Sequence, residues 1–268
     1  MDMMDPHVHV DALNHHALEL MALAGVRALI SMVAIPEVHE NIPSRAIFEH
    51  CDRVRSYHAW RTDNFFRMRT FGCVAVSMVG VPIDYEEALA RLRIYLREHR
   101  EEVLGIGEIG LEPSSATCRD MKTQERIFRA QLEIAKEFAK PVIMHTPPSE
   151  KRTWVDQYIP ILREVGLSPE LVIFDHCNES TVKMITDLGY IAAITVQPWR
   201  KVRPADAAQL VKDGDKERIL IDSDSSLLES DPLAVPKSVL EMRKLGVDEA
   251  DIRQVVWENP KRIYQLAI

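Results

Sequence analysis

The sequence predicts a single (β/α)8 barrel, an α/β domain that spans residues 1–268. Short apolar, β-branched runs alternate with longer amphipathic stretches, which is the pattern of βα units. About eight such units fit into the chain, and a barrel of this kind fills about 250 residues as one domain. The runs 172–174 and 219–221 are continuously apolar, which is typical of buried parallel strands. A doubly wound open sheet is the competing architecture.

The alternation places each expected element in order. We expect a first strand that ends within residues 5–9. We expect the other strands over 26–33, 73–79, 103–108, 141–145, 171–175, 190–196 and 218–221. We expect helices over 13–24, over part of the charged stretch up to 66, and over 85–100, 123–140, 154–165, 180–188, 205–212, 233–244 and 249–258. The order of strands and helices is the part of this prediction that the pattern supports best.

Composition narrows the class of protein. The net charge of −8 argues against a broad basic surface that grips nucleic acid, although it allows a local pocket for one phosphate. No run of 18 apolar residues is present, and the first residues lack a secretory signal, so we expect no membrane partner. The four cysteines, at 51, 73, 118 and 177, have no metal or redox spacing. We therefore expect free thiols and a cytoplasmic protein. The sequence allows a homo-oligomer but contains no interface signal.

Side chains that suit a metal ion stand at the ends of the expected strands, where barrels place their functional groups. The six candidates are His7, His9, Glu108, His145, His176 and Asp224. Each histidine alone fits a satisfied core or surface residue equally well, but together at equivalent strand ends they favour a shared site. His7 and His9 point to the same face of a strand. Asp5 precedes them and either orients an imidazole or is a simple strand-end residue.

The string Gly105-Ile106-Gly107-Glu108-Ile109-Gly110 matches the GxGxxG spacing of dinucleotide-binding loops. Such a loop opens directly into a helix, whereas the next expected helix here begins near residue 120. A carboxylate in the middle of the loop would also repel a pyrophosphate. We interpret the string as a strand end whose glycines allow close approach, and which presents Glu108 as a ligand able to bridge two cations.

Imidazole and carboxylate ligands suit divalent ions such as Zn, Mn, Ni, Fe or Mg, and we expect two ions as cofactors. Metal-bound water has a pKa lowered toward about 7, and the metal also polarises the bond to be cleaved. Asp224 and Glu108 are the expected catalytic residues, with Asp224 as the group that takes the proton from water. The acidic residues 222 and 224 flank Ser223, and Asp224 lies just beyond the strand, which makes it the better ligand.

These motifs resemble the TatD-like hydrolases, metal-dependent members of the amidohydrolase-type barrels. The matching stretches, over nearly the whole chain, are residues 5–9 (DPHVH), 107–112 (GEIGLE), 142–145 (VIMH), 175–177 (DHC), 222–224 (DSD) and 259–260 (NP). The resemblance implies that His7, His9 and Asp224 bind one ion, that His145 and His176 bind the other, and that Glu108 bridges them. It also implies phosphodiester hydrolysis, often of DNA.

The sequence looks closer still to a subgroup of archaeal-type metal-dependent barrel hydrolases of unassigned activity. The supporting stretches are 145–147 (HTP), 175–179 (DHCNE) and 230–237 (SDPLAVPK). Two features depart from the family pattern. The late motif is usually Glu-Thr-Asp and here has Asp222, and residues 38–69 have no clear counterpart, so substrate specificity stays open.

Basic and aromatic residues in the loops after strands five and seven are candidates for substrate contacts. They are Lys151, Arg152, Trp199 and Arg200, with Lys201 and Arg203 in the same run. One interpretation is a phosphate clamp with a stacking tryptophan, and the other is a solvated charged loop. The substrate is then a small molecule or a short nucleic acid. Three functions remain: a phosphoesterase or nuclease, a hydrolase of amides, lactones or carboxylic esters, and a barrel without activity that serves as a pathway partner.

Overall fold

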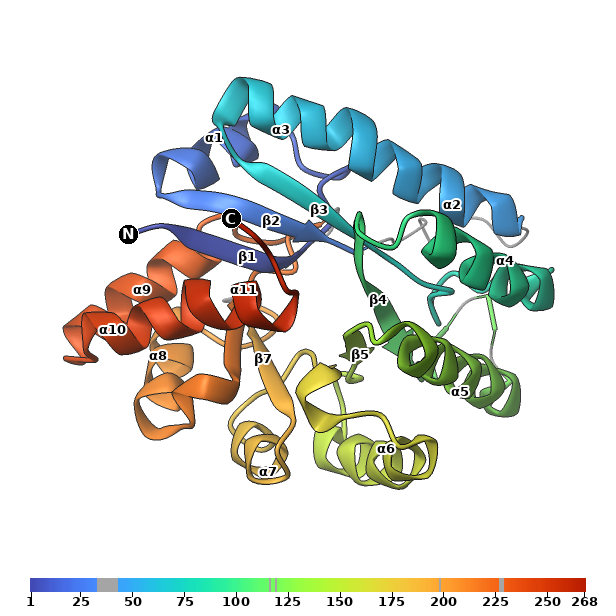
Figure 1. Cartoon of the computed structure of the whole chain (residues 1–268). Helices are drawn as coiled ribbons and strands as arrows, with labels where there is room; N and C mark the ends of the chain where they lie inside the picture. Colours follow the sequence, from blue (N-terminus) through green and yellow to red (C-terminus); the bar gives the residue numbers. More distant parts are fainter. Residues whose placement is uncertain (33–42, 116, 119, 198, 227–228) are drawn as a thin grey trace.

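The computed structural model confirms the (β/α)8 barrel and describes residues 1–32, 43–115, 117–118, 120–197, 199–226 and 229–268. Eight parallel strands pair in sequence order, so an open doubly wound sheet is excluded. The strands are β1 (Met3–Val8), β2 (Val26–Ser31), β3 (Arg69–Val74), β4 (Val103–Gly110), β5 (Val142–His145), β6 (Val172–Phe174), β7 (Ile191–Thr195) and β8 (Ile219–Asp222). Figure 1 shows the helices arranged around these strands.

The barrel closes between its first and last strands. Val8 and Ser225 form a parallel bridge, and the backbone N–H of His9 donates to the carbonyl of Ser225 at 2.8 Å. The backbone N–H of Asp224 donates to the carbonyl of His7 at 3.0 Å. Closure therefore holds the end of β1, with His7 and His9, against the loop after β8, with Asp224.

Helices connect consecutive strands on the outside of the barrel, and three more, α9 to α11, follow the last strand. They are α1 (His15–Leu23), α2 (Ser44–Arg53), α3 (Ala59–Phe66), α4 (Tyr85–Glu98), α5 (Met121–Phe138), α6 (Lys151–Val165), α7 (Val182–Asp187), α8 (Pro204–Asp213), α9 (Ala234–Lys244), α10 (Glu249–Arg253) and α11 (Asn259–Ile263). Two π-helical turns join helices, η1 (Val54–His58) and η4 (Gln254–Glu258), and two 3₁₀ turns, η2 (Pro169–Leu171) and η3 (Lys216–Arg218), precede β6 and β8. No described helix has the length and apolar character needed to cross a bilayer.

The long stretch between β2 and β3 is helical over its described part, as expected. The helices α2 and α3 run on through η1 as one rod that packs on β3 (Figure 1). Residues 38–42 of the segment that lacked a counterpart lie outside the described residues.

Two apolar layers hold the barrel together. The inner layer takes at least one buried side chain from every strand, for example Met4, Leu104 and Leu220. Trp257 and Tyr264, near the C-terminus, pack on this layer at the end where the strands begin. The outer layer lies between the strands and the helices. The opposite end of the barrel, where the strands finish, is left for polar side chains.

The third strand is the main difference from the sequence prediction. It was expected at 73–79 but runs from Arg69 to Val74, because Ala28 of β2 pairs with the polar start of the strand at Arg69. Beyond it, the side-chain amide of Gln131 satisfies both backbone groups of Val76, at 2.7 and 3.0 Å. Ala75 and Val76, directly after the strand, are thus apolar and buried without being part of the sheet.

Candidate metal centre

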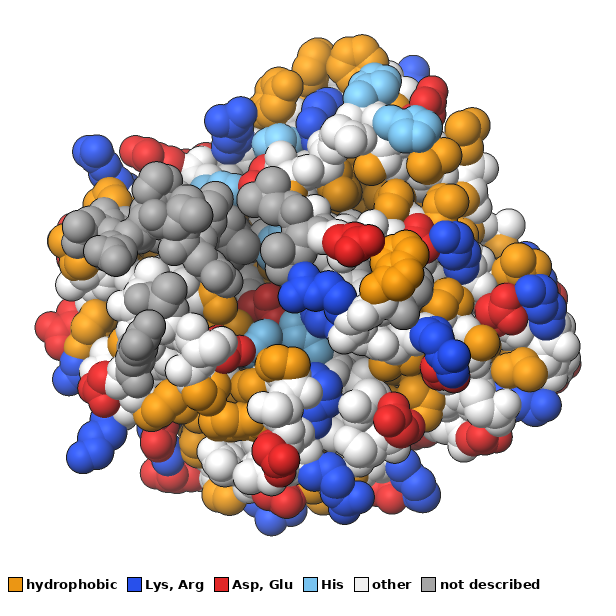
Figure 2. All heavy atoms as spheres, turned by 180° about the vertical axis from the view of Figure 1, so that it is seen from behind, with side chains coloured by type: hydrophobic (Ala, Val, Ile, Leu, Met, Phe, Trp, Pro, Cys, Tyr) orange, Lys and Arg blue, Asp and Glu red, His pale blue; other side chains and the backbone are white. Residues whose placement is uncertain are grey.

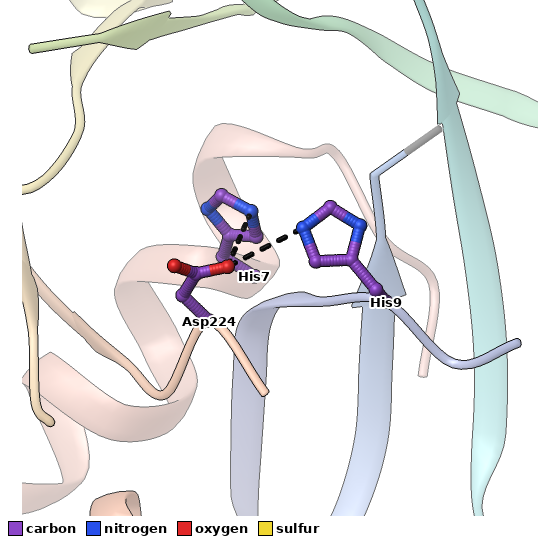
Figure 3. A group of neighbouring side chains, drawn as sticks. All are labelled: His7, His9 and Asp224. Atoms are coloured by element: carbon purple, nitrogen blue, oxygen red, sulfur yellow. Dashed lines mark ion pairs between the residues drawn. The ribbon is translucent and has the colours of Figure 1, made fainter. Parts of the chain in front are cut away.

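The six predicted ligands converge at the carboxyl end of the barrel, in two groups. The first group joins β1 to the loop after β8. Nε2 of His9 lies 3.3 Å from Oδ1 of Asp224, and Nε2 of His7 lies 3.6 Å from the same oxygen. Figure 3 shows both imidazoles turned toward this carboxylate.

The second group joins β4, β5 and β6. Oε1 of Glu108 lies 3.0 Å from Nδ1 of His145 and 3.0 Å from Nε2 of His176. The other oxygen of Glu108, Oε2, lies 3.7 Å from Nε2 of His7. Glu108 therefore stands between the two groups and turns a different oxygen toward each.

Backbone geometry aims these side chains. His176 and Asp224 adopt left-handed conformations, with φ of 57° and 43°, which cost non-glycine residues about 1–3 kcal/mol each. In β4, a Cβ on Gly107 would lie 2.6 Å from Cβ of Ile143. The close approach expected of the glycines before Glu108 is thus present at Gly107.

Neighbouring polar groups hold the ring nitrogens that face away from the centre. Oδ2 of Asp175 accepts a short hydrogen bond from Nδ1 of His7. Nδ1 of His176 lies 2.8 Å from Oγ1 of Thr195, whose hydroxyl donates to Asp175 at 3.1 Å. Asp175, His7 and Glu108 also form a third group of close ligand atoms. Because Asp175 holds the outer nitrogen of His7, we assign it to orientation rather than to metal binding.

Among the described residues Asp5 contacts backbone groups and no imidazole ring, which corrects the first alternative for this residue. Its Oδ1 accepts hydrogen bonds from the backbone N–H groups of His7, at 3.4 Å, and of Ser223, at 3.1 Å. Asp5 therefore joins the backbones of β1 and of the loop after β8. Burial raises the pKa of its carboxyl group to about 6, although the bonds to Ser223 and His7 oppose that shift.

The pKa values in the centre are set by buried histidines and carboxylates that lie beside one another. Burial alone would lower the pKa of His7, but Asp175 and Glu108 raise it well above its usual value. Burial alone would raise the pKa of Glu108, but His7 and His176 lower it well below its usual value. Asp222 is the exception, since burial and the nearby Asp175 raise its pKa strongly. Glu108 is therefore an ionised carboxylate among imidazoles.

The residues fit a divalent metal. Nε2 of His7 is buried and has no hydrogen-bond partner in the part of the chain that the structure describes. It points at carboxylate oxygens that are too distant for hydrogen bonds but close enough to share an ion. The donor set of four imidazoles and two carboxylates is that of transition-metal sites with N and O ligands.

The proposed substrate residues differ in burial and in their distance from the centre. Lys151 is half-buried in the first turn of α6, whereas Arg152, Trp199 and Arg200 are exposed. Lys201 comes closest to the centre, with Nζ 2.7 Å from Oδ2 of Asp224. Figure 2 shows histidine, acidic and basic side chains gathered near the middle of one face of the molecule.

Two functional candidates were not singled out from the sequence. Asp175 belongs to the expected strand end and to the motif at 175–177 without a role of its own, although its place directly before His176 is a usable signal. Lys201 was one cation in a basic run, and nothing in the run distinguishes it from Arg200. Only the fold shows that Lys201 lies 2.9 Å from Nδ1 of His176.

A barrel with this arrangement at its carboxyl end defines the class of metal-dependent barrel hydrolases. Residues 4–265 match the family model described as TatD related DNase, and the chain belongs to this family. The recognition made from the motifs is thereby confirmed, as is the expectation of an enzyme.

Individual relatives agree with this assignment. The chain is 32% identical over 264 residues to an uncharacterised metal-dependent hydrolase of Methanocaldococcus jannaschii, covering 98% of this chain and 100% of that protein. It is 26% identical to the 3′-5′ ssDNA/RNA exonuclease TatD of Pectobacterium parmentieri, covering 62% of this chain and 67% of the relative. The crystal structure of a TatD-like protein from Archaeoglobus fulgidus superposes with a TM-score of 0.80 at 22% identity, covering 98% and 100% of the two chains.

Proposed function

We propose that this enzyme hydrolyses phosphoesters, including those of short nucleic acids, with a binuclear metal centre. The observation that carries the proposal is the position of Glu108, which turns Oε2 toward His7 and Oε1 toward His145 and His176. A carboxylate in this position neutralises the repulsion between two cations. The proposal assigns one ion to His7, His9 and Asp224, and the other to His145 and His176.

The substrate class is supported by two lysines at the mouth of the barrel. Nζ of Lys201 lies beside Asp224, and Nζ of Lys151 is held by the carbonyl oxygens of Thr146 and Pro147, at 3.2 and 3.3 Å. Burial lowers the pKa of Lys151 to about 8, so this residue is mostly positively charged at neutral pH. An acidic protein that keeps two cations beside its centre suits an anionic substrate. The nuclease names of some relatives point the same way.

The residues of the chain have distinct roles in this reaction. Bound divalent ions supply an acidified water and polarise the ester bond. Asp224 is kept ionised because Lys201 and the neighbouring histidines together outweigh the effect of burial and lower the pKa of its carboxyl group well below the usual value. Oδ2 of Asp224 takes a proton from the attacking water and returns it to the leaving oxygen. Lys201 and Lys151 bind the anionic oxygens of the substrate, and the exposed Arg152, Trp199 and Arg200 extend this surface outward.

The first experiment measures bound metal per chain by elemental analysis in the wild type and in Glu108→Ala. We expect about two ions in the wild type and a clear decrease in the variant, since the variant lacks the group between the two sites. Glu133→Ala, which removes an exposed glutamate of α5, is the control and should keep the wild-type content. Absence of metal in the wild type after incubation with Zn²⁺, Mn²⁺ and Ni²⁺ would refute the mechanism.

The second experiment compares substrates with the metal supplied. We expect turnover of bis(p-nitrophenyl) phosphate and of single-stranded oligonucleotides in preference to neutral lactones and dipeptides. Faster turnover of a lactone or an amide would favour the second class of hydrolase. A metal-loaded protein that turns over none of these would support the pathway-partner alternative. The cytoplasmic location and a homo-oligomer remain predictions, and size-exclusion chromatography with light scattering tests the latter.

A further inference from the structure

Both ring nitrogens of His145 face carboxylates. Nδ1 lies 3.0 Å from Oε1 of Glu108, and Nε2 lies 3.0 Å from Oε2 of Glu112. Glu108 belongs to the proposed centre, whereas Glu112 belongs to neither of the two ligand groups and lies just after β4. The contact between His145 and Glu112 therefore needs an explanation of its own.

Glu112 is held rigidly for this contact. Its Oε1 accepts hydrogen bonds from the backbone N–H of Ser114, at 2.8 Å, and from the hydroxyl of Ser114, at 2.6 Å. Its backbone N–H donates to Oε1 of Gln124 at 2.7 Å, and Nε2 of Gln124 donates to its carbonyl at 2.9 Å. The residue is 7% exposed. One carboxylate oxygen is thus fixed by its own loop, and the other is presented to His145.

We propose that Glu112 is a positioning residue that sets the tautomer and ring orientation of His145 for metal binding. This inference rests on the proposed metal centre. A neutral imidazole carries one proton, and a carboxylate at Nε2 keeps that proton on Nε2. Nδ1 is then unprotonated and faces Glu108, where the second ion would be bound.

The same arrangement recurs around the centre. Asp175 holds the outer nitrogen of His7, and Thr195 holds the outer nitrogen of His176. In each case the inner nitrogen faces Glu108. Glu112 completes this pattern for His145, because without it Glu108 would be the carboxylate beside the ring and would favour the proton on Nδ1, the nitrogen needed for the ion.

Zinc affinity tests the inference. Metal-free wild type, Glu112→Gln and Glu112→Ala are titrated with Zn²⁺ against a chromophoric chelator, with Glu133→Ala as the control. We expect two ions in the wild type, and in Glu112→Ala an affinity for one of them that is reduced about 10- to 100-fold. Glu112→Gln should lose less of this zinc affinity, because its amide oxygen still accepts a hydrogen bond from Nε2. It should still bind more weakly than the wild type, because the amide carries no charge. It also preserves the shape of the side chain if the alanine variant fails to fold.

A spectroscopic readout separates positioning from general stability. Long-range ¹H–¹⁵N spectra of zinc-loaded protein with ¹⁵N-labelled histidine should show His145 protonated at Nε2 and shifted by zinc at Nδ1. In Glu112→Ala this signature should weaken while that of His7 stays. Unchanged affinities and spectra, or an equal weakening of both ions together with a lower Tm in Glu112→Gln, would overturn the positioning role. A wild type that binds no zinc overturns the metal centre itself, so the two failures are distinct.

Discussion

Asp175 and His7 are 168 residues apart in the chain, yet the carboxylate of Asp175 accepts a hydrogen bond from Nδ1 of His7. The bond directs Nε2 of His7 toward Asp224 and Glu108. We therefore expect Asp175→Asn to weaken zinc binding about 10- to 100-fold, because an amide neither fixes the same tautomer nor supports the imidazole electrostatically. Competition with a chelator measures this loss. Asp187→Asn, on the exposed side of α7, should bind zinc like the wild type, and an unaltered affinity in Asp175→Asn would refute the orienting role.

Lys201 donates to Oδ2 of Asp224 and lies beside His176. Its positive charge therefore has two proposed roles: it attracts the anionic substrate, and it keeps the proposed base Asp224 ionised. We expect Lys201→Met to lower kcat/KM for bis(p-nitrophenyl) phosphate about 10- to 100-fold, the range for a lost hydrogen bond to a charged group. The acidic limb of the pH–rate profile should move to higher pH, because the pKa of Asp224 rises without this cation.

A matched comparison isolates the two effects of Lys201. Arg203→Met removes a cation from the same loop that is paired with Asp206 at the surface, and it should leave both kcat/KM and the pH profile unchanged. An equal loss in the two variants would mean that the loop acts through its overall charge and not through Lys201.

The sequence was sufficient to predict the fold and the convergence of the six candidate ligands, because both depend on local patterns. His145 and His176 each follow an apolar strand, and a barrel brings such strand ends together whatever lies between them. The third strand was predicted in the wrong place because its start is set by pairing with β2. Arg69 and Thr70 are polar, so the start of this strand does not appear as an apolar run in the sequence. Contacts between loops, such as that of Lys201 with Asp224, depend on how a loop folds back over the barrel, and no periodicity encodes that.

His58, in the π-helical turn between α2 and α3, predicts a pH-dependent stability. Burial and the nearby Arg61 lower its pKa to about 4, and both ring nitrogens lack hydrogen-bond partners among the described residues. Since the folded state holds the proton less tightly than the unfolded state, this contribution is complete above about pH 6.5 and is lost as the pH falls toward 4. When the pH falls from 7 to 5, the free energy of unfolding should decrease by about 2 kcal/mol more in the wild type than in His58→Leu.

Urea unfolding of the two proteins at several pH values measures this difference. His16→Leu, which removes an exposed histidine of α1, is the control and should follow the wild type. Parallel curves for the wild type and His58→Leu would show that His58 keeps its ordinary pKa in the folded protein.

Gly107, directly before Glu108, is required by packing inside the barrel. A Cβ at this position would lie 2.6 Å from Cβ of Ile143, an atom fixed to the backbone of β5 that no rotamer change can move. Gly72 in β3 is the matched control, because an added Cβ there meets its nearest atoms at 3.5 Å and beyond, which is ordinary contact.

We expect Gly107→Ala to lower the free energy of unfolding by about 1–3 kcal/mol, measured by thermal or urea unfolding, and Gly72→Ala to lower it clearly less. Because the shift of β4 needed to relieve the contact would also move Glu108, the bound metal of Gly107→Ala should decrease as well. Equal stability of the two variants would mean that the barrel tolerates a side chain between β4 and β5, and that the glycine before Glu108 has no packing role.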